Sequence, residues 1–152
     1  MGDRHWQRDG GCRCHRLRFR ASAAPLLASA CHCTGCQRMT GSAFSLTTTI
    51  VADAFVVVAG DPVLGGIRGA EVHHYHCDFC KSWVFTRPVP DMGFVNVRTT
   101  MFDDSTDLEP FLEVFTAERL PWASTPAVRS YAGAPAFDEY EGLLADYAAR
   151  QG

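Results

Sequence analysis

The sequence is short of lysine and of long hydrophobic runs, and the second shortage limits what the protein can be. Of its 14 basic residues only Lys81 is a lysine, a bias from which we draw no function. The longest apolar stretch, residues 54–60, is far below the roughly 20 residues that a membrane-spanning helix requires. Residues 1–10 carry no apolar run of the signal-peptide kind. We therefore expect a soluble cytoplasmic protein that does not bind membranes.

Several familiar functional signatures are also missing. The sequence has no Gly-rich phosphate loop, no dinucleotide-binding fingerprint and no Ser-His-Asp arrangement. The formal net charge of −3 argues against nucleic acid as a partner. The length of 152 residues fits one compact domain, and an apolar share of 47% is ordinary for a globular protein.

Cysteine, in contrast, is plentiful. Seven cysteines form the groups Cys-x-Cys, Cys-x-Cys-x-x-Cys and Cys-x-x-Cys, namely Cys12, Cys14, Cys31, Cys33, Cys36, Cys77 and Cys80. An odd count without a secretory signal argues against a disulfide framework. Thiolates two or three residues apart can converge on one metal ion. All-sulfur ligation selects zinc or an iron–sulfur cluster, and because the spacings do not match ferredoxins, zinc is favoured.

Seven thiolates divide into four and three. A closed structural zinc site needs four ligands, whereas a catalytic site needs three and keeps one exchangeable position. The contiguous cluster at residues 31–36 supplies three ligands, and the pairs at residues 12–14 and 77–80 supply four. This division predicts two zinc ions per chain, of which the second is labile. The alternative is one structural zinc with three spare thiols.

Hydrophobic patterning predicts a mainly β protein with a terminal helix. Strand patterns occur at residues 17–20, 44–51, 55–58, 71–76, 83–86, 93–97 and 111–115. Residues 60–62 and 65–66 have turn chemistry. A short helix is expected over residues 34–41, with its positive N-terminal end near the triple cysteine cluster. An amphipathic helix is expected over residues 137–150. The apolar side chains that recur in it at three- and four-residue spacing are Phe137, Tyr140, Leu144 and Tyr147.

Around the cysteines the sequence resembles a known family. The resemblance is carried in order by residues 11–14, 31–38, 41–44 and 77–80, and more weakly by residues 102–104, 110 and 121–122. These stretches resemble the glutathione-dependent formaldehyde-activating enzyme family, which also includes centromere protein V. The resemblance implies a zinc-stapled β-tent, which we expect as small antiparallel sheets with a C-terminal helix. We expect a flexible leader at residues 1–9, a zinc-binding domain at residues 10–125, and a C-terminal extension at residues 126–152 whose helix packs on the domain.

The resemblance also implies the roles of the cysteines. The positions that match the structural zinc ligands are Cys12, Cys14, Cys77 and Cys80, and those that match the catalytic zinc ligands are Cys31, Cys33 and Cys36. The family usually has Gly after the second cysteine of each two-cysteine loop, where this chain has His15 and Lys81. Because Gly would allow a left-handed turn, these loops are expected to be shaped differently.

The activity that the resemblance implies is condensation of formaldehyde with glutathione to S-hydroxymethylglutathione, which is a carbon–sulfur lyase reaction run in reverse. The implied partners are a small thiol such as glutathione and an aldehyde; no oligomeric state is predicted. An enzyme is favoured over a zinc-stabilised binding module because the triple cluster has no fourth ligand nearby. A closed site would need His32, a histidine at residues 73–76 or an unrecognised carboxylate. Thiol redox chemistry or metal buffering is a third alternative.

Four further side chains have alternative roles, and a fifth has one expected role. Arg38, beside the triple cluster, could bind a substrate carboxylate or lie on a solvated helix face. His32 could donate a proton to a reacting oxygen, although packing or facing solvent is favoured. Asp103 and Asp104 could form an acid–base pair, although a turn is favoured because Ser and Thr follow. Trp122 is expected to anchor the tail against the sheet.

Overall fold

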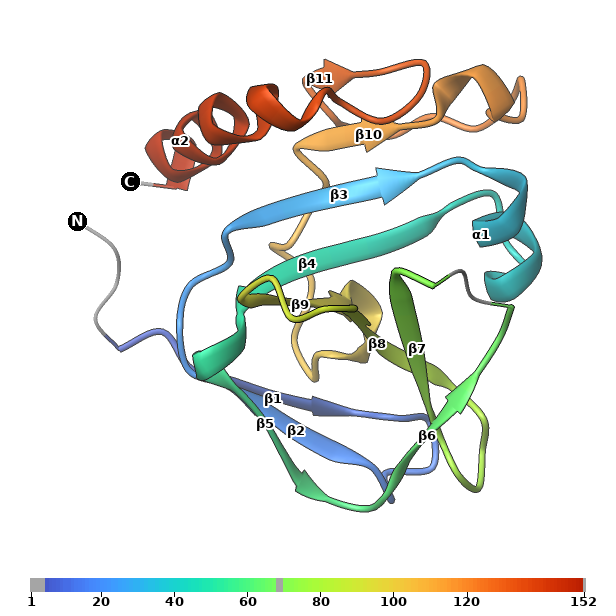
Figure 1. The fold of residues 1–152 in the computed structure, drawn as a ribbon, viewed down its shortest axis with the longest axis vertical. Coiled ribbons are helices and arrows are strands. Elements are labelled where there is room, and N and C mark those ends of the chain that lie inside the picture. The colour runs from blue at the N-terminus through green and yellow to red at the C-terminus, as the bar shows by residue number, and fades with distance from the viewer. Residues whose placement is uncertain (1–4, 68–69, 152) are drawn as a thin grey trace.

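The structure, a computed structural model, describes residues 5–67 and 70–151 and confirms a mainly β fold with a C-terminal helix (Figure 1). In chain order its strands and α-helices are β1 (Arg8–Gly11), β2 (Arg18–Ala21), β3 (Leu27–Cys31), α1 (Thr34–Thr40), β4 (Ser45–Val51), β5 (Phe55–Ala59), β6 (Pro62–Gly65), β7 (Val72–Cys77), β8 (Trp83–Pro88), β9 (Phe94–Arg98), β10 (Leu112–Val114), β11 (Arg129–Ser130) and α2 (Tyr140–Gln151). Short 3-10 turns lie at Ala52–Ala54, Thr99–Met101, Thr116–Glu118 and Phe137–Glu139.

The leader expected over residues 1–9 falls partly outside the described residues, because residues 1–4 are not among them. Its last part belongs to the fold, since β1 begins at Arg8. The division into leader, domain and extension stays a prediction.

The strands form two sheets that enclose an aromatic core. One is antiparallel, in the order β1-β2-β5, and the other has the order β11-β10-β3-β4-β9-β8-β7-β6. The larger sheet is antiparallel except at one edge, where β10 runs parallel to both β3 and β11. Phe19 and Phe55 of the smaller sheet have ring centroids 5.3 Å apart, and Phe55 lies 4.9 Å from Phe85 of the larger sheet. Apolar contacts between these rings therefore hold the sheets together.

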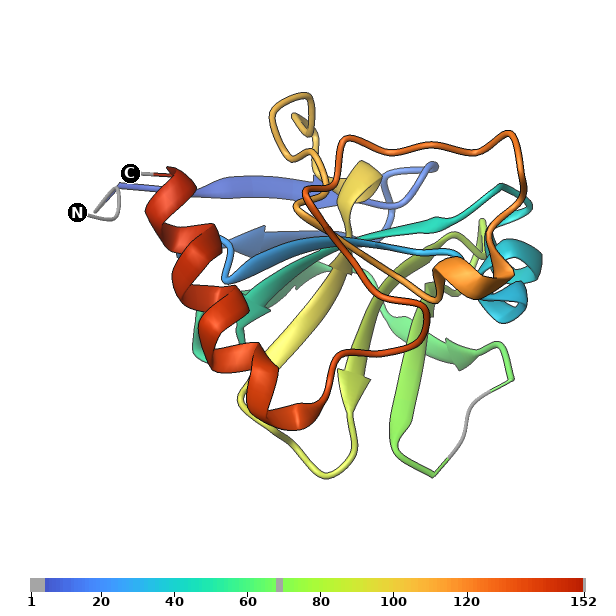
Figure 2. The same ribbon diagram turned by 90° about the horizontal axis from the view of Figure 1, so that it is seen from above.

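The helix α2 packs on the β3–β10 side of the larger sheet (Figures 1 and 2). A second cluster of buried side chains forms there: Leu27, Ala28, Phe111, Leu112, Leu143 and Tyr147. The helix was predicted correctly, but its buried face was only partly right. Leu143 is 4% exposed, whereas Phe137, which the sequence suggested for this face, is 85% exposed and precedes the helix. The prediction for Trp122 was wrong, because its side chain is 75% exposed and anchors nothing.

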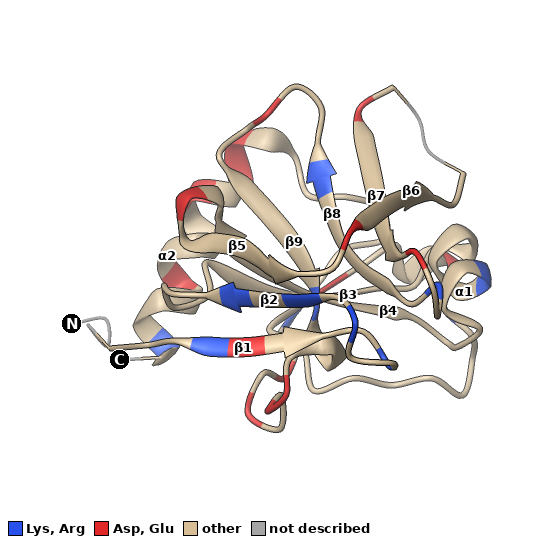
Figure 3. Ribbon diagram, turned by 90° about the horizontal axis from the view of Figure 1, so that it is seen from below, with Lys and Arg blue, Asp and Glu red and all other residues tan. Residues whose placement is uncertain are grey.

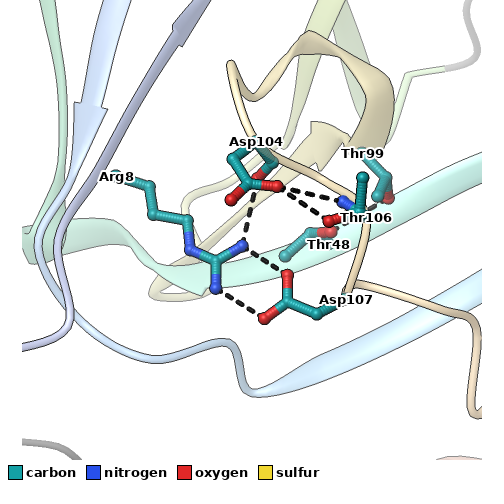
Figure 4. Close-up of polar contacts among 6 residues, drawn as sticks. All are labelled: Arg8, Thr48, Thr99, Asp104, Thr106 and Asp107. Carbon is teal, nitrogen blue, oxygen red and sulfur yellow. Dashed lines mark hydrogen bonds and ion pairs between the residues drawn. The ribbon is translucent and has the colours of Figure 1, made fainter.

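The carboxylates in the loop after β9 hold the chain through hydrogen bonds and ion pairs. The side chain of Asp104 accepts hydrogen bonds from the backbone and hydroxyl of Thr106 at 3.3 and 3.0 Å, and its carbonyl oxygen accepts one from Arg8 (Figure 4). Arg8 also donates to both carboxylate oxygens of Asp107 at 2.7 Å. Asp103 pairs with Arg18 of β2, one of the basic residues that Figure 3 shows along β1 and β2. The turn expected here is therefore confirmed.

Candidate metal centres and the adjoining cavity

The first candidate metal centre joins the two sheets through four cysteines that are distant in sequence. The Sγ atoms of Cys12, Cys14, Cys77 and Cys80 all lie within 4.8 Å of one another. Two of these separations are 3.5 Å, between Cys12 and Cys14, and 3.7 Å, between Cys14 and Cys77. A tetrahedral zinc ion with Zn–S bonds of about 2.3 Å would place its sulfurs about 3.8 Å apart. The geometry and the all-sulfur donor set therefore fit a closed zinc site.

The backbone of each two-cysteine loop is built to present sulfur. In the first loop the amide of Cys12 donates to the carbonyl of Leu17 at 3.0 Å, and the amide of Leu17 donates to Cys12 Sγ at 3.3 Å. In the second loop the amide of Cys77 donates to the carbonyl of Ser82 at 3.0 Å, and the amide of Cys80 donates to Cys77 Sγ at 3.4 Å. Such N–H···S bonds stabilise the thiolate form that a metal requires.

Both loops take a left-handed turn, although neither has the glycine that would favour it. His15 has φ 67° and Lys81 has φ 62°, although neither is glycine. The amides of these two residues donate to the carbonyls of Cys12 and Cys77 at 3.1 and 3.2 Å, which closes each loop. The expectation that the loops differ in shape is therefore wrong. The hydrogen bonds and packing of each loop outweigh the steric cost of a side chain in this region.

The second candidate metal centre lies where β3 meets α1. The Sγ atoms of Cys31, Cys33 and Cys36 lie within 4.8 Å of one another. Cys31 ends β3, and Cys33 is the N-cap of α1, its Sγ accepting a hydrogen bond of 3.2 Å from the amide of Cys36. Among the described residues no histidine or carboxylate joins this group within that range. The set fits a metal held by three thiolates with one position left for another ligand.

The three thiols do not ionise alike when they share protons with one another. The hydrogen bond from Cys31 lowers the pKa of Cys36 to about 5, and contacts with Ser45 and the charge of Arg98 act in the same direction. The same hydrogen bond raises the pKa of Cys31, and burial adds to that rise. Two neighbouring thiolates repel each other, so a bound cation is needed to hold all three deprotonated.

His32 lies between Cys31 and Cys33 in the sequence, and its side chain faces away from the cluster. Its ring is fully buried, and Nε2 lies 2.9 Å from Oε1 of Glu113 on β10. Ser130 donates to the other oxygen of Glu113 at 2.9 Å. The packing role favoured from the sequence is therefore confirmed.

The histidines of residues 73–76 are also absent from both cysteine clusters in the described part of the chain. His74 Nδ1 lies 2.8 Å from the hydroxyl of Thr86, and this threonine hydroxyl accepts a hydrogen bond from Trp83. The trio therefore supplies no ligand to either candidate centre.

A cavity of about 420 Å³ opens near the triple cluster, and none of the three cysteines is among its lining residues. Its lining residues are Met39, Thr40, Ser42, Phe44, Ser45, Leu46, Lys81, Ser82, Trp83, Arg98, Thr100 and Met101. Arg38 is not among them; it is exposed in the last turn of α1, and its role in binding a carboxylate stays a prediction. Arg98 and Ser45 were not predicted as site residues, because nothing near them in the sequence marks them as parts of a site.

Strand register places the cavity next to the cluster. Cys31 on β3 is opposite Ser45 on β4, and Thr47 on β4 is opposite Arg98 on β9. Opposite residues of antiparallel strands point to the same face, as do residues two apart on one strand. Cys31, Ser45 and Arg98 therefore share one face of the larger sheet.

These features define a class of protein: a mainly β fold with one four-thiol and one three-thiol cluster, each able to hold a metal ion. A scan against protein-family models matches residues 7–118 to the family described as glutathione-dependent formaldehyde-activating enzyme. Because this match covers most of the sequence, the chain belongs to that family.

Other comparisons add little. A search of curated proteins finds no match to this chain. Among solved structures it is similar to the crystal structure of a Rhodobacter sphaeroides protein, a structural-genomics target, with a TM-score of 0.49 and 17% sequence identity. The likeness covers 62% of this chain and 87% of that one. Within the described residues no helix is long and apolar enough to cross a membrane.

Proposed function

We propose that the protein is a zinc-dependent enzyme that makes or breaks the carbon–sulfur bond of a thiol–aldehyde adduct, as an S-hydroxymethylglutathione synthase does. Cys12, Cys14, Cys77 and Cys80 hold a structural zinc ion in this proposal. Family membership supports glutathione as the thiol and formaldehyde as the aldehyde. We place the protein in the cytoplasm in this proposal, because both compounds are small solutes.

The observation that carries the proposal is the open donor set of the triple cluster. Cys31, Cys33 and Cys36 bring three sulfurs within 4.8 Å of one another, and no other potential ligand of the described chain completes the group. Three thiolates leave a divalent zinc ion one exchangeable position, and that ion would stabilise a substrate thiol as its thiolate at neutral pH. A cavity large enough for a small molecule adjoins the cluster.

The protein's own residues would position the reactants. The three cysteines hold the metal, and the walls of the cavity orient the thiol and limit access of water. The substrate thiol gives its proton to solvent, and its sulfur attacks the carbonyl carbon, forming a C–S bond while the π electron pair of the C=O bond moves to oxygen. That oxygen takes a proton from solvent to give the hemithioacetal. The reverse sequence, with the proton returned and the C–S bond broken, is the lyase direction.

Replacing one ligand of the triple cluster tests the proposal. We expect wild-type protein to hold two equivalents of zinc, and Cys33→Ser to hold one while keeping its circular-dichroism spectrum. NMR exchange spectroscopy should follow the interconversion of S-hydroxymethylglutathione with free formaldehyde and glutathione. Wild-type protein should accelerate this interconversion, and Cys33→Ser should not. A Cys33→Ser protein with two equivalents of tightly bound zinc would contradict the ligand assignment.

The same measurements separate the enzyme from a binding module. A binding module with a closed second site would hold two zinc ions and leave the exchange rate at its uncatalysed value. Arg20→Gln is a suitable control, because Arg20 pairs with Asp9 on the smaller sheet and contacts neither cysteine cluster. It should match wild-type protein in both zinc content and exchange rate.

A further inference from the structure

The cavity beside the triple cluster contains a buried arginine that has no acidic partner. Arg98 is 8% exposed, yet within the described residues no carboxylate lies at ion-pairing distance from it. Its Nε atom is buried without a hydrogen-bond partner, and its guanidinium carbon lies 4.1 Å from the centroid of the Trp83 ring. Contact with this ring stabilises the cation but satisfies none of its N–H groups. A buried guanidinium with no carboxylate nearby lacks the oxygen acceptors that it normally binds.

Other arginines of the chain have the acidic partner that Arg98 lacks. Arg8, Arg18, Arg20 and Arg129 each pair with an aspartate near the surface. Arg98 is more buried than these, so an unpaired charge costs more there. The nearby sulfurs of Cys31 and Cys36 attract its charge, but metal-bound thiolates direct their electron density toward the metal and leave the N–H groups of Arg98 free for another acceptor.

The rest of the cavity also suits an anion. Its lining contains two basic residues, Lys81 and Arg98, and neither aspartate nor glutamate. Five lining residues carry hydroxyls, namely Thr40, Ser42, Ser45, Ser82 and Thr100. The volume of about 420 Å³ is in the range of small-molecule sites. Phe44 and Trp83 supply apolar surface for the uncharged part of a ligand.

We propose that this cavity binds the anionic part of the substrate thiol, and that Arg98 holds a substrate carboxylate while the sulfur lies at the triple cluster. The inference deepens the proposed function and rests on it. A guanidinium matches a carboxylate through two parallel N–H···O bonds, which would fix the distance between the carboxylate and the reacting sulfur. Small carboxylate-bearing thiols are therefore the expected substrate class, and neutral thiols of the same length should be poor substrates.

Two thioether probes test the site apart from the reaction. S-methylglutathione carries both carboxylates of glutathione but no free thiol, and its diethyl ester carries no carboxylate. Isothermal titration calorimetry on zinc-loaded wild-type protein should show that the acid binds 10- to 100-fold more tightly than the diester, as expected for a charge-assisted hydrogen bond. The protein's net charge of −3 works against this preference, so a preference for the acid must arise locally.

Variants assign the preference to Arg98. Arg98→Gln should remove the preference for the acid while keeping two equivalents of zinc, and Arg98→Lys should retain part of it. Arg87→Gln is the matched control, because Arg87 also lies over aromatic rings but does not line the cavity, and it should keep the full preference. If Arg98→Gln fails to fold, the comparison of acid and diester in wild-type protein still decides whether an anion is preferred.

Three results would overturn the inference: equal binding of acid and diester, a preference that survives Arg98→Gln, or loss of one zinc ion in Arg98→Gln. The last would mean that Arg98 serves the metal centre as a counter-charge. Failure of the proposed function is distinguishable, because it would appear as no acceleration of thiol–aldehyde exchange while the Arg98-dependent preference for S-methylglutathione persists.

Discussion

The backbone angle of one residue decides whether each two-cysteine loop can close. His15 and Lys81 follow the second cysteine of their loops and have φ angles of 67° and 62°. The left-handed region costs a residue with a side chain about 1–2 kcal/mol relative to the right-handed one. Glycine avoids most of that cost but loses more conformational entropy on folding. The chain therefore carries a modest strain next to its proposed structural zinc site.

Removing the side chain at one of these positions should stabilise the protein. We expect His15→Gly to raise the free energy of unfolding by up to about 1 kcal/mol, because relief of strain exceeds the entropy that glycine loses. Urea denaturation of the zinc-loaded protein would measure the change. Arg13→Gly is the control: Arg13 lies in the same loop, is exposed and has no positive φ, so glycine should lower stability there. A less stable His15→Gly protein would show that the side chain contributes contacts that outweigh the strain.

Some residue roles could be predicted from the sequence and others could not. For His32 a packing or solvent-facing role was favoured over proton donation, and the structure buries its ring. Its partner Glu113 could not be predicted, because the two residues are 81 positions apart. Arg98 was missed for the same reason. Residues of other strands bury it, and neither this burial nor its unpaired state can be seen in the sequence around it.

Among the elements, those with a clear hydrophobic period were predicted and those set by pairing were not. The pattern at residues 44–51 predicted β4, and the helix expected over residues 34–41 is α1. The sequence Leu-Ala-Ser-Ala-Cys of β3 gave no strand signal because its side chains are small. β3 is a strand because it pairs with β4 on one side and β10 on the other. Pro62 and Gly65 were assigned to turns and no strand was predicted between them, but residues 62–65 form β6.

The helix α2 provides a test of the corrected buried face. Leu143 is 4% exposed between the helix and the larger sheet, so Leu143→Ala should lower the free energy of unfolding by about 2–4 kcal/mol. Phe137, which is 85% exposed, should tolerate alanine with a change of less than about 0.5 kcal/mol. Urea denaturation measures both. Equal losses would mean that the helix packs with a different face.

At the scale of the whole molecule, the grouping of the cysteines was predictable and the cavity was not. Ligand number and spacing alone divided seven cysteines into four and three, and the two clusters of sulfur atoms have this composition. The cavity is lined by residues of α1, β4, β8 and β9 and the segments between them, so it exists only after the strands have paired. Prediction from sequence therefore reached the metal centres but not the surface that would select a substrate.

The two clusters should contribute unequally to the stability of the whole molecule. A zinc ion shared by Cys14 and Cys77, which are 63 positions apart, would link the two sheets, whereas one held by the triple cluster would close a loop of about five residues at the end of β3. In a chain-entropy model such closures are worth about 4 and 2 kcal/mol. Cys14→Ser should therefore lower the free energy of unfolding by about 4 kcal/mol or more, because the weakened site contributes less metal-binding free energy to folding.

Cys33→Ser is the matched control, since it removes one thiol from the other cluster, and its loss should stay below about 2 kcal/mol. Urea denaturation at saturating zinc would measure both, and a chelator should bring wild-type protein close to Cys14→Ser. If Cys33→Ser were the less stable of the two, the triple cluster would be the structural centre.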